Sequence, residues 1–206
     1  NPQVFKSHYP QMVLPKPDHV DKNRLLAALE LGYKGADLWA YIRLIYGEYG
    51  WMAQSDSDEL LSNLQILKTK TRALIPYEHA SPIVEEIENT IDGCRRPKTA
   101  QSDLDPIKIQ AKRVSGRLAR CASLLPIAEA NMLRLGLQLG RIYHHVDDLP
   151  EEAARADVEM KVRNVLPPAS GPAIESRFLE ASSLDDGYRW AMKIYSFVER
   201  EISFAI

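Results

Sequence analysis

The sequence has few cysteines and no long apolar run, and each of these absences excludes a class of protein. Its 206 residues include two cysteines, Cys94 and Cys121, which are too few for the disulfide framework of a small secreted domain. We therefore expect a cytoplasmic or other reducing intracellular compartment. No apolar stretch approaches the roughly 20 residues that a membrane-spanning helix needs, so we expect no membrane span. Because the sequence starts at Asn1 rather than Met, we expect it to be a fragment of a longer chain.

The sequence also lacks a large net charge and the common motifs of enzymes. A formal net charge of −2 provides no overall attraction to nucleic acid or to membranes, so any anion-binding site has to be local. No glycine-rich phosphate loop is present, and no serine lies in the context of a nucleophile elbow. We therefore expect a protein that is not an enzyme and that needs no cofactor.

The sequence does contain helical periodicity along most of its length. No segment alternates apolar and polar residues as a half-buried strand does, so we expect an all-α fold. An extended apolar arm is expected over 1–17 and a helical core domain over 18–165. A C-terminal helical segment is expected over 173–206, after a proline-rich linker at 166–172. Within the core domain, shorter helices are predicted over 21–32, 36–47, 55–75, 81–93 and 150–165.

The longest periodic pattern predicts one long central helix over 105–148. Asp105 can cap its first amide groups, and Pro106 suits the first helical position. Pro126 lies inside the pattern, so we expect a kink there, or two helices stacked nearly end to end. Gly136 and Gly140, one turn apart, are expected to let another helix pack closely. Alternating steps of four and three place the apolar residues on one face: Ile107, Ala111, Val114, Leu118, Cys121, Leu125, Ala128, Met132, Leu135, Leu139, Ile142 and Val146.

A run of cations on this helix is the first candidate binding site. No acid occurs between 107 and 120, so these cations repel one another unless an anion is present. Phosphate is the natural counter-charge, and the lack of aromatic residues here favours a sequence-independent contact with nucleic acid. The alternative is a solvated face that acids of a neighbouring helix neutralise, such as Glu85, Glu86 and Glu88. The candidate residues are Lys108, Lys112, Arg113, Arg117 and Arg120, with Arg95 and Arg96 just upstream.

The N-terminal arm is the second candidate site. Residues 1–17 contain four prolines and no helical period, so we expect an extended conformation. The arm is too apolar for a freely solvated tail, and we expect it to lie on this chain or on a neighbouring subunit. The leading interpretation is a non-catalytic assembly or scaffold protein that forms homo-oligomers or binds partner subunits. The arm residues that carry this interpretation are Val4, Phe5, Tyr9, Met12 and Leu14.

Two alternative functions depend on shorter motifs. In residues 135–148 a glycine precedes Asp147 and Asp148 by about two turns, and this segment resembles the second aspartate-rich motif of class I isoprenoid synthases. The resemblance implies that both aspartates hold Mg²⁺ against a diphosphate, and the sequence 18–21 is the candidate for the facing motif. Residues 58–75 loosely follow the spacing of a helix-turn-helix, which would make the protein a DNA-binding regulator. A single uninterrupted helix explains the same residues.

Overall fold

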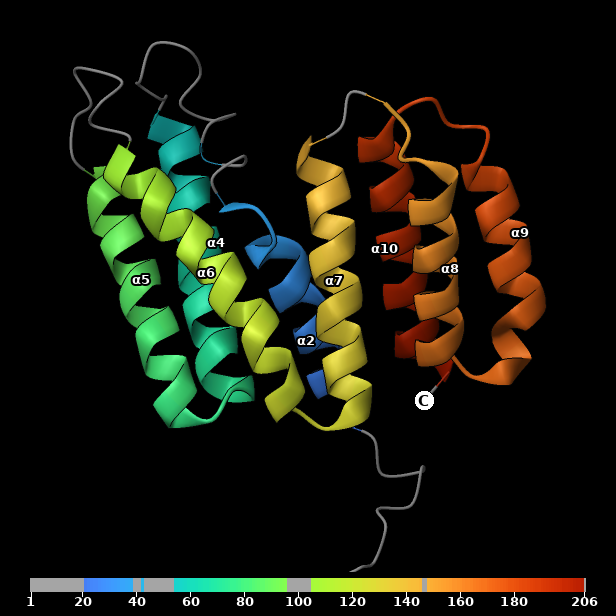
Figure 1. The fold of residues 1–206 in the computed structure, drawn as a ribbon, viewed down its shortest axis with the longest axis horizontal. Helices are drawn as coiled ribbons and strands as arrows, with labels where there is room; N and C mark the ends of the chain where they lie inside the picture. Colours follow the sequence, from blue (N-terminus) through green and yellow to red (C-terminus); the bar gives the residue numbers. More distant parts are fainter. Residues whose placement is uncertain (1–20, 39–41, 43–53, 96–104, 146–147, 206) are drawn as a thin grey trace, which may run out of the picture.

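The computed structural model describes residues 21–38, 42, 54–95, 105–145 and 148–205. Every regular element in this part of the chain is a helix, which confirms the predicted all-α class. The helices form an elongated array with α5 at one edge and α9 at the other (Figure 1). The predicted arm at 1–17 and most of the helix predicted over 36–47 lie outside the described residues.

One hydrophobic core includes residues from each of the described α-helices. Residues of α10 pack on α7 and α2, and α9 packs on α8 and α10. The division into a core domain and a C-terminal segment stays a prediction. In chain order the elements are α2 (Lys22–Gly35), α4 (Gln54–Leu74), α5 (Tyr77–Arg95), α6 (Asp105–Cys121), the 3₁₀-helix η3 (Ala122–Leu124), α7 (Ile127–His145), α8 (Glu152–Val165), the 3₁₀-helix η4 (Pro168–Ser170), α9 (Gly171–Ala181) and α10 (Gly187–Ala205).

The single long helix predicted over 105–148 is not confirmed, because the chain reverses near the expected kink. α6 ends at Cys121, η3 follows, and Leu125 adopts an extended backbone before α7 begins. Pro126 disfavours a helical conformation at the preceding residue and has no N–H to continue the helix. α6 and α7 therefore run in opposite directions (Figure 1). At the start of α7 the predicted row is interrupted, since Ala128 is exposed whereas Ala130 is buried, but the row resumes as predicted at Met132.

The centre of the fold is a close contact between α2 and α7, which run parallel (Figure 1). A Cβ added to Gly32 would lie 2.4 Å from the carbonyl oxygen of Leu133, and one added to Gly136 would lie 2.2 Å from that of Leu29. Gly140 is equally close, at 2.3 Å from a backbone oxygen of α2. No side chain fits at such distances, so glycine is required for the two backbones to approach. The predicted packing role of Gly136 and Gly140 is confirmed, whereas Gly32 packs within α2 instead of ending it.

Other predicted boundaries shift because interior residues were taken for helix ends. α5 begins at Tyr77 and continues through Pro82 to Arg95, so neither Pro82 nor Gly93 marks an end. The C-terminal helices begin earlier than predicted, since the proposed linker at 166–172 contains η4 and the start of α9. α8 confirms the helix predicted over 150–165, and α4 ends ahead of Pro76 as predicted.

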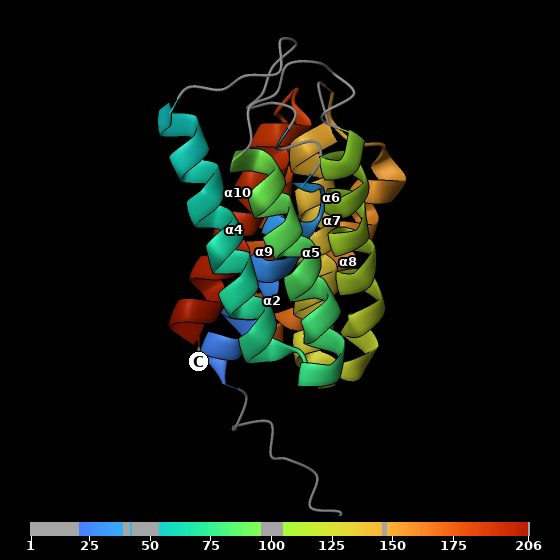
Figure 2. The ribbon, with the colours of Figure 1, turned by 90° about the vertical axis from the view of Figure 1, so that its left-hand side faces the viewer.

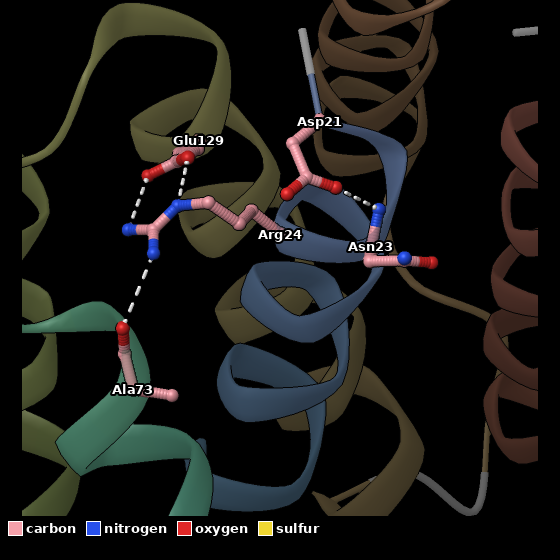
Figure 3. Close-up of polar contacts among 5 residues, drawn as sticks. All are labelled: Asp21, Asn23, Arg24, Ala73 and Glu129. Atoms are coloured by element: carbon pink, nitrogen blue, oxygen red, sulfur yellow. Dashed lines mark hydrogen bonds and ion pairs between the residues drawn. The ribbon is translucent and has the colours of Figure 1, made fainter.

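Arg24 connects the start of α2 to two other helices (Figure 3). Its Nε donates to Oε1 of Glu129 on α7 at 2.6 Å, and its Nη1 donates to the carbonyl of Ala73 near the end of α4 at 3.2 Å. The guanidinium group thus neutralises a carboxylate and satisfies a carbonyl that the end of a helix leaves unpaired. Beside it, Asp21 accepts a hydrogen bond from the amide of Asn23 at 2.9 Å and caps α2 as predicted.

Arg24→Met should destabilise the fold more than Glu129→Gln does. The Glu129 side chain is 9% exposed and the Arg24 side chain is 41% exposed. Arg24→Met leaves the buried carboxylate of Glu129 without a counter-ion, which should lower the free energy of unfolding by about 2 kcal/mol. Glu129→Gln leaves an arginine that water can hydrate, so the loss should be about 1 kcal/mol. Urea unfolding of both variants measures the difference. A greater loss for Glu129→Gln would contradict this account of the pair.

Candidate anion-binding strip and apolar end

α6 presents three of the predicted cations on its outward face. Its apolar row from Ile107 to Cys121 is buried, and α6 lies in front of α2 and α4 in Figure 1. Successive residues are rotated by about 100° around a helix, so Gly116 points directly away from the buried row. Lys112 and Arg113 lie one turn before it, and Arg120 lies one turn after it. We call these four residues the outward strip, and its three cations are exposed.

Arg113 and Arg117 both reach Glu86 on α5, and Arg117 lies farther around the helix from Gly116 than Arg113 does. Nη2 of Arg117 lies 4.0 Å from Oε1 of Glu86, and Nη1 of Arg113 lies 3.5 Å from the same oxygen. The Glu86 side chain is 11% exposed, so this carboxylate is a mostly buried counter-ion shared by two guanidinium groups. Glu86 is one of the acids that the alternative interpretation expected to neutralise the cations. Part of the predicted cation row is therefore paired within the protein.

The cations predicted to form one surface thus divide into groups. Helical geometry places Lys108 on the flank of α6 opposite to Arg113, and Lys108 is half-buried. Within the described part of the chain, neither Lys112 nor Arg120 forms an ion pair with an acid. Arg95 is the last residue of α5, with a side chain outside the described residues, and residue 96 is not described either.

Gly116 was not identified from the sequence, although it lies in the middle of the outward strip. A Cβ added there would meet Nη1 of Arg120 at 3.7 Å and no other described atom within 4 Å. Packing therefore does not require a glycine at this position. A glycine inside a helix costs about 0.5–1 kcal/mol relative to alanine. In the sequence, a glycine between cations inside a predicted helix is the feature that could have indicated this position.

Four large apolar side chains are exposed at one end of the bundle, which we call the apolar end. Tyr77 begins α5 and is 84% exposed, Ile127 begins α7 and is 82% exposed, and Phe204 lies near the end of α10 and is 83% exposed. Leu124 in η3 is the fourth. Figures 1 and 2 show these helix ends spread along the same side of the molecule as the start of α2, where residues 1–20 join the described chain. Five other exposed apolar residues are distributed over α6, α8, α9 and α10.

The structure does not bring together the aspartates of the isoprenoid-synthase resemblance. Asp21 precedes α2 at the apolar end, whereas Asp148 follows α7 at the opposite end (Figure 1). Asp147 lies outside the described residues. In the part of the chain that is described, no group of three metal-ligating side chains is close enough to hold an ion. α4 likewise runs without interruption through 58–74, where a helix-turn-helix needs a turn.

An aromatic cluster joins α2, α7 and α10 towards the end opposite to the apolar end. The rings of Tyr33 and Tyr195 stack at 4.1 Å, and Tyr143 contacts Tyr33 and Tyr188 at 5.2 and 4.3 Å between centroids. Burial raises the pKa of Tyr33 and Tyr195 and lowers the pKa of the adjacent His144 to about 4. These three groups are therefore uncharged near neutral pH. We interpret the cluster as packing between helices.

No protein-family model, curated protein or solved structure matches the chain. None of the described helices combines the length and the apolar character needed to cross a membrane. The outward strip and the apolar end are the features of the molecule that indicate a function.

Proposed function

We propose that the protein is a non-catalytic helical assembly protein that self-associates through its apolar end. In this proposal the N-terminal arm of each copy packs on the apolar end of the other copy. The observation that carries the proposal is the exposure of Tyr77, Ile127 and Phe204, each more than four-fifths accessible, at one end of the molecule. Single exposed apolar residues are common, but strongly exposed ones at three helix ends on the same side of the molecule favour an interaction surface.

The position of the arm supports its assignment as the occupant of this surface. Residues 1–20 join α2 at the apolar end, beside the Arg24 pair with Glu129 and Ala73. Tyr77 follows Ala73 by a few residues, and Ile127 precedes Glu129 by a few residues. An extended chain spans about 3.3–3.6 Å per residue, so the 17 residues of the arm can reach across roughly 55–60 Å. In a two-fold dimer the same surface of both copies meets, which places each arm beside the end of its partner.

Light scattering of the full chain and of a chain without residues 1–17 tests this proposal. We expect the full chain to show a concentration-dependent mass that reaches that of a dimer, and the shortened chain to remain a monomer. The double variant Tyr77→Asp, Ile127→Asp should also be a monomer, because it places charges in an apolar contact. Both side chains are exposed, so the helical content and the melting temperature should change little.

Leu179→Asp is the matched control, because Leu179 on α9 is 75% exposed but does not belong to the apolar end. This variant should keep the dimer. A full chain that is monomeric at every concentration would exclude self-association. A shortened chain with an unchanged dimer mass would exclude the arm as the contact.

A further inference from the structure

We infer that the outward strip of α6, formed by Lys112, Arg113, Gly116 and Arg120, binds the phosphates of a nucleic-acid duplex without reading its sequence. The inference is independent of the proposed self-association, because it concerns the outward face of α6 and not the exposed apolar side chains. It rests on three observations: the charge of the strip, the glycine at its centre and its length.

Two of the three cations in the strip have no acidic ion-pair partner in the described part of the chain, and the third shares its partner. Lys112 and Arg120 are exposed and form no ion pair with any acid in the described ranges. Arg113 is 59% exposed and shares the single carboxylate of Glu86 with Arg117. Like charges one turn apart on a helix repel one another, and a phosphate placed between them removes this repulsion. Because the net charge of the whole chain is −2, the attraction has to come from this local group.

The glycine at the centre of the strip leaves space where a ligand can approach the helix. At Gly32 and Gly136 a neighbouring backbone within 2.4 Å explains why no side chain is present. At Gly116 the atom that a Cβ would meet is the guanidinium of Arg120 at 3.7 Å. The sequence thus keeps a residue that weakens the helix at a place where the fold does not need it. Departures of this kind are expected at functional sites, because a binding requirement overrides local stability.

The length of the strip fits a phosphodiester backbone better than a single phosphate. Lys112 and Arg120 are eight residues apart, which is roughly 12 Å along the helix axis. One strand of a duplex carries about three or four phosphates over this length. No aromatic residue occurs in the sequence of α6, so the strip offers no aromatic ring for stacking on unpaired bases, and a duplex is favoured over a single strand. Lysine and arginine contacts to phosphates carry no sequence information, which makes the contact sequence-independent.

Fluorescence anisotropy of the full chain with a short labelled DNA duplex of mixed sequence tests the inference. Three phosphate contacts predict a slope of about −2.7 when log affinity is plotted against log salt concentration. Lys112→Gln and Arg120→Gln should each reduce this slope by about 0.9 and weaken binding about tenfold at roughly 50 mM salt. Arg200→Gln is the control, because Arg200 is an exposed cation on α10, and its affinity should equal that of the wild type.

Gly116→Leu distinguishes a ligand site from a solvated charged face. Leucine is a good helix former, so the variant should melt at a higher temperature than the wild type. Its side chain would fill the space between the cations, and we expect a loss of affinity of about tenfold, as for one lost phosphate contact. None of these variants should change the mass measured by light scattering, so failure of this inference and failure of self-association are distinguishable.

Three results would overturn the inference. The first is that the wild type does not bind the duplex at roughly 50 mM salt and protein concentrations up to about 1 mM, because counter-ion release favours phosphate contacts more at this salt concentration than at physiological salt. The second is that Lys112→Gln and Gly116→Leu bind as tightly as the wild type. The third is equal or tighter binding to single-stranded DNA of the same length, or to vesicles that contain phosphatidylserine, since the strip would then recognise a different anion.

Discussion

Gly136→Ala is expected to destabilise the protein by about 3 kcal/mol, although alanine is the better helix former. The added methyl group would lie 2.2 Å from the carbonyl oxygen of Leu29 and 2.9 Å from the amide nitrogen of Tyr33. Both are backbone atoms of α2, so no side chain can rotate away to make room. The helices would have to separate along a contact that extends over most of α2, and the packing around it would be lost.

The same substitution at Gly116 should have the opposite sign. A methyl group there meets no backbone atom, so Gly116→Ala should stabilise the fold by about 0.5–1 kcal/mol through the higher helix propensity of alanine. Urea unfolding of the wild type and the two variants measures both changes. A stabilising Gly136→Ala would contradict the close contact between α2 and α7, and a destabilising Gly116→Ala would contradict the open surroundings described for Gly116.

Leu118→Ala should cost roughly 2–5 kcal/mol. The Leu118 side chain is fully buried. A Cβ added to Gly35 would lie only 2.4 Å from Cδ1 of Leu118. Leu118 thus fills the space that this glycine leaves on α2. Because α2 is held by α7, it cannot move to close the cavity, and we expect a loss in the upper half of this range. Leu139→Ala on α7 removes an equally buried side chain and should cost a similar amount.

Leu179→Ala serves as the control for both leucine variants, because Leu179 is 75% exposed. Its effect should be within about 0.5 kcal/mol. Thermal and urea unfolding of the three variants give the comparison. Leucine variants that all unfold like the wild type would show that the predicted buried face is exposed to solvent.

Periodicity predicted which residues of α6 and α7 are buried, but it could not predict how the two helices are connected. Val114, Leu118, Leu135 and Leu139 are all fully buried, as the steps of four and three indicate. The spacing of residues along the chain determines which side of a helix each one faces, and this depends only on residues that are close in the sequence. Whether the chain bends or reverses at Pro126 depends on the contact between α7 and α2, which involves residues far away in the sequence.

Glycine illustrates the same limit at the level of single residues. Gly32, Gly116 and Gly136 all occur in helical patterns, and the sequence alone does not separate their roles. Gly32 was predicted to end a helix, Gly116 was not singled out, and the packing role of Gly136 was predicted correctly. The distance from each glycine to a neighbouring backbone distinguishes them, and this distance is a property of the tertiary structure.

The candidate sites were also predicted in part. The cation-rich helix and the acid at Glu86 could be identified, because charges on a helix are visible in the sequence. The division of the cations required the direction of each side chain in the folded protein. Tyr77 and Ile127 were missed, since each directly follows a proline at a helix start, where a single apolar residue produces no periodic signal.

The parallel contact between α2 and α7 has a consequence for the order in which the chain folds during synthesis. Gly32 and Gly136 are about 100 residues apart, whereas α4, α5 and α6 contact their neighbours in the sequence. At a synthesis rate of roughly 5–20 residues per second, α2 waits on the order of 5–20 s for its partner. The glycine-containing side of α2 that packs on α7 stays exposed to water during this interval. α2 is the first described helix to be made and can pack on α4 early, but its contact with α7 is among the later ones to form, so the α7-facing side of α2 is a surface that a ribosome-bound chaperone would meet.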